Sequence, residues 1–167
     1  RPEGWEVTVS QMPDREADVV FHVPWHSLVP YEPPDGQKQV MVAVGYVTAG
    51  VDMRAIQAGD VQVNGEALTL RLPAPALQDC ILDEGKTYIA AQDTGLFARP
   101  ATNVDQETRR YAIQQLRQSA LDGNILSEAQ TQATAAVTQF ANLLGVQSVQ
   151  VTFRSAAEET VLPPSCA

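Results

Sequence analysis

The amino-acid sequence predicts an α+β fold, with a mainly antiparallel sheet, two C-terminal helices packed on one face of it, and a closing C-terminal strand. Three observations carry this prediction. Alternating strand patterns dominate the chain before residue 100, helical periodicity appears at about 105–121 and again at 127–144, and a last alternating segment follows at 149–153. This order of strands, helices and a final strand is typical of a sheet with its helices on one side.

The 167 residues fit one domain, 1–167, and the apolar content of 44% is that of a globular chain rather than a disordered one. We divide it into a strand and proline-rich region at 1–38, a central region at 39–153 and an irregular tail at 154–167. The chain begins at Arg1 without Met, and we interpret it as a mature or truncated form from which a leader or anchor could have been removed.

The N-terminal region predicts two strands and a loop. Trp5, Val7 and Val9 alternate with polar residues, and Val19–Val23 forms a second strand-like run. Residues 24–36 contain four prolines and end in Asp35-Gly36. Because proline removes a backbone donor and fixes φ, this segment is predicted as a loop.

The stretch from 39 to 77 is expected to build the sheet on which the rest of the chain packs. Residues 40–47 are apolar at both odd and even positions, which indicates a central strand buried on both faces. Asp52 is predicted to act as the N-cap of a short helix over 53–57. Asn64-Gly65 is predicted to close a hairpin through a type I′ turn, since both residue types tolerate positive φ.

Two amphipathic helices and a final strand follow. The first helix is predicted to bury Ala112, Ile113, Leu116 and Ala120, and to end at Asp122-Gly123-Asn124. Gly145 is a ready residue for the end of the second helix. The second helix is predicted to bury a stripe formed by Ala129, Ala133, Ala136, Val137, Phe140 and Leu144.

The charge balance excludes some classes of partner. The formal net charge is −9 at pH 7, which repels phosphate backbones and anionic lipid, so we expect no nucleic-acid ligand. No apolar run approaches the ~18 residues of a membrane span. Contact with a membrane is therefore expected only through an anchor outside this chain.

Two cysteines, Cys80 and Cys166, lie far apart and lack the CxxC spacing of a zinc knuckle. They could form a disulfide that closes a long loop, or they could be two unrelated thiols. Disulfides persist in oxidising compartments, so an extracytoplasmic setting would favour the bridge.

Several motifs together resemble an uncharacterised bacterial family, domain of unknown function 4230. They comprise a strand ending in a Gly-Ile-Asp-Leu-like turn, a hairpin, a Gly-Phe-like turn, a Gly-Ile-Leu-x-x-Ala helix junction into which Asn124 is inserted, and a closing strand. The residues that carry the resemblance are 45–53, 60–75, 94–97, 120–129 and 144–151. Members of that family commonly carry a membrane anchor before the domain, which implies an extracytoplasmic, membrane-tethered setting here. The family has no established activity, so the resemblance implies no catalytic residue.

Candidate metal ligands are few. His22 and His26 are the only histidines, and their i, i+4 spacing would present two ligands on a helix, but Pro24 lies between them and the segment reads as a strand. Four acidic residues after the hairpin could supply oxygen ligands for calcium, but they lack an EF-hand spacing and are expected to be solvated: Asp79, Asp83, Glu84 and Asp93.

Catalytic signatures are absent from the sequence. There is no nucleophile elbow, no P-loop and no dinucleotide fingerprint, and the helix cap explains Asp52 without chemistry. We therefore predict no cofactor and a non-catalytic binding or assembly module with an unknown protein partner or small ligand. The expected contact region combines the proline-rich segment with the acidic one. The alternatives are a small metal-dependent hydrolase that uses His22, His26 and an acidic group from Asp79 to Asp93, and a carrier of a lipid or small ligand.

Overall fold

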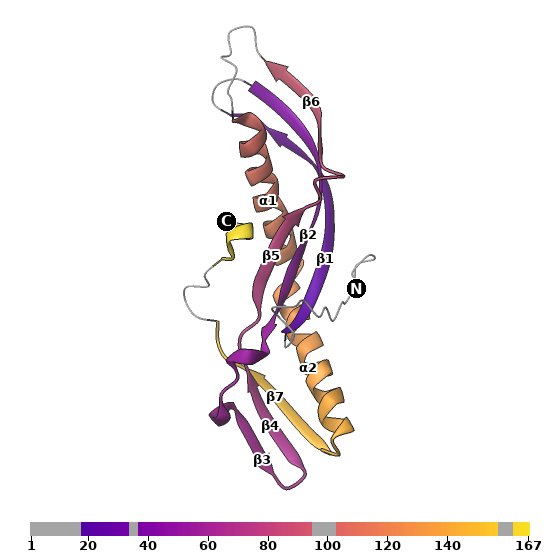
Figure 1. Cartoon of the computed structure of the whole chain (residues 1–167), viewed down its shortest axis with the longest axis vertical. Helices are drawn as coiled ribbons and strands as arrows, with labels where there is room; N and C mark the ends of the chain where they lie inside the picture. Colours follow the sequence, from indigo (N-terminus) through magenta and orange to yellow (C-terminus); the bar gives the residue numbers. More distant parts are fainter. Residues whose placement is uncertain (1–17, 34–36, 95–102, 157–161) are drawn as a thin grey trace.

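The computed structural model describes residues 18–33, 37–94, 103–156 and 162–167. In this part of the chain the molecule is elongated, with one sheet at each end and two helices arranged one after the other along its length (Figure 1). The fold class is α+β, as predicted, but the strands form two sheets instead of one. The strand expected around Trp5 lies outside the described residues.

The larger sheet is organised by β2 (Gln37–Asp52), which has β1 (Asp18–Tyr31) on one side over its whole length. On its other side β2 pairs with β5 (Ala76–Leu82) and, nearer its start, with β6 (Tyr88–Thr94). All of these pairs are antiparallel. The central position predicted for 40–47 is confirmed, because β2 has neighbours on both sides. The predicted burial of both faces holds for only one of them: alternate residues from Met41 to Val47 are buried, whereas Val40, Val42, Val44 and Tyr46 are half-buried.

The prediction of a loop at residues 24–36 is wrong for residues 24–31, which belong to β1. Pro24 and Pro30 lie inside β1, opposite Tyr46 and Val40 of β2. Among the described strands β1 pairs only with β2, so it forms an edge of the sheet. An edge strand tolerates proline because half of its backbone N–H groups face away from the ladder.

The smaller sheet contains β3 (Val61–Asn64), β4 (Ala67–Leu72) and β7 (Ser148–Phe153), in that order. The strand β7 is the predicted closing strand, and it pairs with β4 in parallel. Two short 3₁₀ helices, η1 (Met53–Ala55) and η2 (Ala58–Asp60), connect β2 to this sheet. The chain thus passes from the larger sheet to the smaller one directly after its central strand.

The predicted hairpin exists, but its turn lies one residue later than expected. Asn64 still pairs with Ala67, so the two turn residues are Gly65 and Glu66. Only Gly65 has a positive φ, of 62°. A glycine at the first of two turn positions is typical of type II′ rather than type I′, and it leaves Asn64 in the strand.

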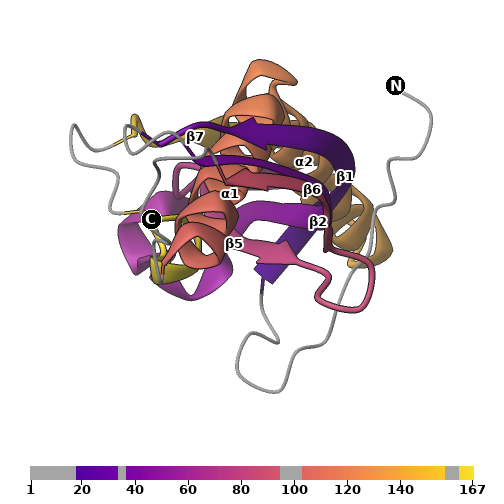
Figure 2. The ribbon, with the colours of Figure 1, turned by 90° about the horizontal axis from the view of Figure 1, so that it is seen from above.

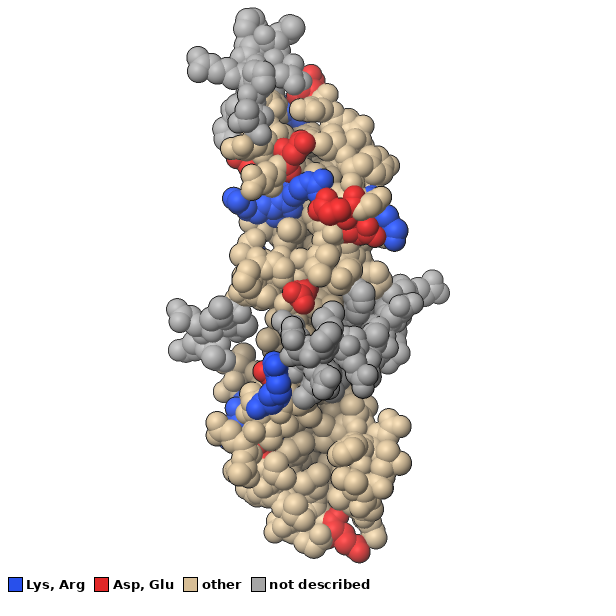
Figure 3. Space-filling view, in the orientation of Figure 1, with Lys and Arg blue, Asp and Glu red and all other residues tan. Residues whose placement is uncertain are grey.

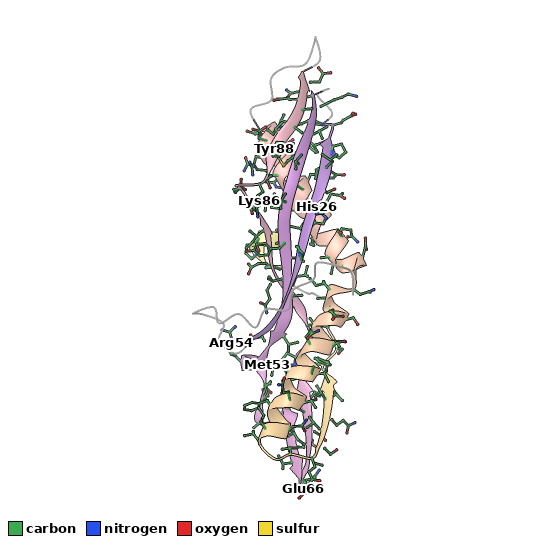
Figure 4. The ribbon with its side chains drawn as sticks, turned by 90° about the vertical axis from the view of Figure 1, so that its right-hand side faces the viewer. His26, Met53, Arg54, Glu66, Lys86 and Tyr88 are labelled. Atoms are coloured by element: carbon green, nitrogen blue, oxygen red, sulfur yellow. A yellow bond between two sulfur atoms is a disulfide. The ribbon has the colours of Figure 1, made fainter. Side chains whose placement is uncertain are left out.

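The helices α1 (Val104–Asp122) and α2 (Ile125–Leu143) match the predicted ranges to within two residues. They follow each other end to end along the molecule, with only Gly123 and Asn124 between them (Figures 1 and 4). Asn124, rather than the glycine, adopts the left-handed conformation, with φ 60°. The helix α1 packs on β1, β2 and β5, whereas α2 runs from the larger sheet to β7. Figure 2, which looks along the long axis, shows α1 beside β2 and β5.

The core has two parts that correspond to the two sheets. The larger part fills the space between the larger sheet and the helices, and Met41, Leu116 and Ile125 are completely buried there. The smaller part joins Val51, Leu70, Leu72 and Ala133, where α2 meets the smaller sheet. At about 25 cal/mol per Å² of apolar surface, these contacts supply the main drive for folding at both ends.

One buried polar pair also joins α1 to the central strand. The hydroxyl oxygen of Thr108 lies 2.7 Å from the amide oxygen of Gln39, and the amide nitrogen of Gln39 donates to Asp105 at 2.7 Å. Both Gln39 and Thr108 are buried. Because buried polar groups without partners are costly, this pairing favours one register of α1 on β2.

Candidate functional site

The structure separates the two candidate histidines. Both lie on β1, with His22 opposite Thr48 and His26 opposite Val44. On a strand, residues four apart are about 13 Å apart along the chain, too far to bind one ion. His26 is exposed on the sheet edge (Figure 4). Within the described residues, no group of three or more histidine, cysteine or carboxylate side chains converges as a metal site.

The acidic residues after the hairpin are dispersed and have individual partners. Lys86 lies 3.1 Å from Asp83, and its ammonium group holds the pKa of that carboxyl below its usual range. Arg109 of α1 pairs with Glu84, and Ser165 donates to Asp79 at 3.2 Å. Asp93 lies on β6, opposite Lys38. These carboxylates act as local ion-pair and hydrogen-bond partners instead of forming one oxygen-rich cage.

The expected contact region is divided as well. The proline-rich segment belongs to β1 as far as Tyr31, whereas the acidic segment belongs to β5, β6 and the turn between them. Because β1 and the pair β5 and β6 lie on opposite sides of β2, these strands occupy opposite edges of the larger sheet.

Cys80 and Cys166 form a disulfide between β5 and the last residues of the chain. Both residues are buried, and they belong to the larger part of the core. The short helix η3 (Pro164–Cys166) is fixed by further contacts: the side chain of Ser165 accepts a hydrogen bond from the backbone of Cys80 at 3.3 Å, and Arg117 donates to the Cys166 carbonyl. The bridge therefore holds the C-terminus against β5 and α1.

Asp52 caps η1, as predicted for a helix in this place, although the helix is shorter than expected. Its carboxylate accepts the backbone N–H of Arg54 at 3.0 Å and pairs with the guanidinium of the same residue at 2.9 Å.

A shallow hollow of about 310 Å³ lies beside Asp52, between β2, β5 and residues 162–164. A second hollow of about 430 Å³ lies beside Tyr31 and Glu107, whose side chains share a hydrogen bond of 3.0 Å. The first hollow is lined by the Asp52–Arg54 ion pair, and the second places a phenol beside a carboxylate.

A second carboxylate, Asp60, ties the connection between the sheets to the end of β7. It accepts the backbone N–H of Gln57 at 2.9 Å and a hydrogen bond from the Arg154 guanidinium, which also donates to the Ala55 carbonyl at 3.2 Å. The Gln57 hydrogen bond, followed by that of Arg154, lowers the pKa of Asp60. The folded state therefore favours the ionised form of the Asp60 carboxyl.

We expect this contact to make stability depend on pH. A carboxyl with a lowered folded-state pKa contributes stability above its unfolded pKa, and that contribution is lost as the pH falls through the folded value. Asp60→Asn should therefore lower the urea midpoint at neutral pH, and the difference from wild type should shrink in acid. Glu66→Gln, at the hairpin tip, is the control. A difference that stayed constant across the pH series would contradict this role.

The most distinctive surface of the described residues lies at the far end of the smaller sheet. We define the end patch as the exposed apolar residues of β3 and of the C-terminal turns of α2. Val63, Phe140, Leu143 and Leu144 are 67%, 64%, 79% and 69% exposed. Val61, at 40%, completes the end patch.

The end patch contradicts part of the predicted core. Phe140 and Leu144 follow Ala133 and Val137 on the same helical stripe, and the periodicity therefore predicted their burial. They are exposed because the smaller sheet leaves them uncovered within the described residues. The sequence signal that points to this surface is the lack of charge: residues 129–153 contain no Asp, Glu, Lys or Arg, and residues 61–70 contain only Glu66.

The figures show the same distribution. On the face drawn in Figure 3, charged side chains gather over the upper and middle parts of the molecule, and the lower end is mostly uncharged down to an acidic tip. Figure 4 places Glu66 at that tip. A large exposed apolar surface with little charge is a mark of an interaction site.

Comparison with known proteins gives a family but no activity. A family model described as "Protein of unknown function (DUF4230)" matches residues 8–151. No curated protein and no solved structure matches the chain. In the described part of the chain, no helix is both long and apolar enough to cross a membrane.

Proposed function

This chain belongs to the DUF4230 family of proteins of unknown function, and we propose that it is a non-catalytic binding or assembly module of an exported or membrane-tethered bacterial protein. The observation that carries this proposal is the end patch, where four large apolar side chains are more than half exposed. Monomeric soluble proteins rarely leave such residues together in water without a partner. The partner is expected to be a protein surface that covers them.

The setting is supported by the disulfide. Cys80 and Cys166 are both buried, and the bridge joins segments separated by 86 residues. Disulfides of this structural kind persist in oxidising compartments and are rare in a reducing cytosol. A chain that depends on this bridge fits the cell envelope, where an exported or anchored module would work.

The arrangement of the two ends suits an assembly role. The disulfide and most of the charged side chains visible in Figure 3 lie with the larger sheet. The central strand of that sheet, β2, has 16 residues and is about 50 Å long. The end patch lies at the opposite end, on β3 and the last turns of α2 (Figure 1). A rod of this kind holds one contact surface away from the rest of the molecule, at a defined distance and direction.

The proposal is tested by changing the end patch and measuring the size of the native assembly. Leu143→Ser combined with Leu144→Ser removes the two most exposed apolar side chains, and surface changes of this kind cost only ~0.5 kcal/mol of stability. Gln139→Ser combined with Asn142→Ser, on the same turns of α2, is the matched control. Each protein would be produced in its bacterial host, extracted with a mild detergent and separated by native electrophoresis.

We expect wild type and the glutamine–asparagine control to migrate together in an assembly larger than the chain. The double leucine variant should leave that assembly while it remains folded by circular dichroism. Identical migration of all three proteins would overturn the proposed role of the end patch.

A further inference from the structure

The end patch lies on an unusually open sheet edge. Within the described residues β3 pairs only with β4, and all four of its residues are exposed. Natural edge strands are commonly protected by proline, lysine, a bulge or an inward charge. The strand β1 has Pro24 and Pro30, whereas the only such protection of β3 is its short length of four residues. The outer edge of β3 is therefore able to accept another strand.

The two faces of the smaller sheet differ completely, which restricts how a strand can be added. Val63, Leu68 and Val149 form one row across the sheet, and Val61, Leu70 and Val151 form the next. The alternate residues, which face the other way, are polar or small, with Gln62 on β3 and Gln150 on β7 as examples. Any added strand must therefore place its apolar residues beside Val61 and Val63, because a slip by one residue would move them to the polar face.

The uncovered half of the apolar face adjoins the last turns of α2. Ala133 and Val137 pack against Leu70, Leu72 and Val151, which covers the β4 and β7 side. Gln147 and Ser148, just after α2, donate to the Glu66 carbonyl at 3.1 and 3.3 Å, so the end of α2 is held beside the hairpin tip. Phe140 and Leu144 continue the same stripe towards that tip, and they are available to cover a strand placed beside β3.

These observations point to a specific occupant. We infer that the end patch joins two copies of this chain through antiparallel pairing of their β3 strands, which deepens the proposed assembly function and rests on it. The pairing that satisfies the alternation and places both valines opposite valines has Gln62 opposite Gln62 of the partner subunit, on the two-fold axis. Val61 then lies opposite the partner subunit's Val63, and the two three-stranded sheets become one.

The distribution of charge selects the surface at which two copies can approach each other. Each chain has a net charge of −9, so two copies repel over most of their surfaces. The strand β3 and the last turns of α2 carry no charged side chain, which makes this the surface where two copies approach at least electrostatic cost. A bilayer fits less well, because the end patch lacks the Trp, Tyr, Lys and Arg residues that hold proteins at lipid interfaces.

Pairing between like strands is also favoured over pairing of β3 with β7. Val149, Val151 and Phe153 of β7 are half-buried beneath α2, whereas both valines of β3 are exposed. A contact between β3 and β7 would in addition be head-to-tail and would continue into rings or filaments. The like-strand contact closes after two copies.

The test uses the purified chain and measures its mass by sedimentation across a concentration series. Wild type is expected to reach twice the mass of one chain. Val63→Lys should weaken that association about tenfold or more, because it places a charge opposite an apolar residue at the centre of the contact. Gln150→Lys, which adds the same charge to the polar face of β7, is the control and should associate like wild type. Circular dichroism checks that both variants are folded.

The register has a sharper test in Gln62→Cys. Two such residues on the two-fold axis lie close enough to form a disulfide between copies, so mild oxidation should give a covalent dimer on a non-reducing gel. Gln150→Cys should form no covalent dimer under the same conditions and should migrate as a single chain on the same gel. A cross-link at position 150 and none at 62 would overturn the β3 pairing.

Other outcomes also decide the matter. A folded wild-type chain that stays monomeric at every concentration contradicts the inference, and so does growth into rings or filaments. Binding of the monomer to vesicles of neutral lipid, lost in Val63→Lys, would replace the second copy by a membrane. If the chain is monomeric but the double leucine variant still leaves the cellular assembly, the inference fails while the proposed function stands with a different partner.

Discussion

Removal of the Cys80–Cys166 disulfide is expected to lower the free energy of unfolding by about 4–5 kcal/mol, the value that chain entropy gives for a loop of this length. The bridge closes 86 residues of sequence, so its loss greatly increases the freedom of the unfolded chain. It also releases η3, whose Cys166 is completely buried in the core. Few single contacts in a domain of this size contribute as much.

The measurement is denaturant unfolding of wild type with and without reductant, beside Cys80→Ala combined with Cys166→Ala. Reduced wild type and the double variant should unfold at the same lower midpoint, and reductant should not affect the variant. The variant therefore controls for any effect of the reductant itself. A loss below ~1 kcal/mol would contradict the structural role of the bridge.

Gly45→Ala should have the second large effect, a loss of about 3 kcal/mol of stability. A Cβ atom at this position would lie 2.4 Å from the carbonyl oxygen of Ile81 and 3.2 Å from the side chain of Leu82. A backbone oxygen cannot rotate away as a side chain does, so the pairing of β2 with β5 must open. Because β2 is the central strand, that opening disturbs the whole larger sheet.

Gly59→Ala is the matched control for this prediction. A Cβ atom at Gly59 would meet nothing within 4 Å, and its backbone conformation is one that alanine adopts. The control should change the free energy of unfolding, measured by urea denaturation, by no more than ~0.5 kcal/mol. If the two alanine variants had equal stability, the close approach of β2 to β5 at Gly45 would be wrong.

Local signals account for the parts of the fold that were predicted correctly. The helices α1 and α2 are marked by long periodic stripes and by residues that end them, and Gly145 takes the left-handed conformation expected after α2. The strand β2 is marked by apolar residues on both faces, which only a central strand requires. Asp52 is marked by the short helix that directly follows it. Each of these features depends on a few neighbouring residues.

The parts that were missed depend on which elements become neighbours. The strand β1 continues through Pro24 because it is an edge, and edge position is a property of the whole sheet. The strand-like pattern at Val19–Val23 did predict that His22 lies on a strand, but it did not show that the same strand continues to His26. Phe140 and Leu144 have the period of core residues, but the smaller sheet contains too few strands to cover them. Periodicity shows which face of a helix is apolar, and the length of the partner decides how much of that face is buried.

The difference between periodicity and burial also explains why the candidate site was missed. A sequence without catalytic motifs directs attention to its few histidines and carboxylates, and the structure separates both sets. The functional signal is instead the absence of charged residues on β3 and at the end of α2. Apolar residues at a core-like spacing, without charged neighbours and at the end of an elongated fold, indicate a surface that another protein completes.

The most direct test of that claim is site-specific photo-cross-linking in living cells. A photoreactive residue would replace Leu144 of the end patch in one strain and Gln150, on the polar face of the same sheet, in another. We predict strong protein adducts from position 144 and few from position 150. Adducts of equal strength at both positions, or none at 144, would show that the end patch is not the contact surface of this protein.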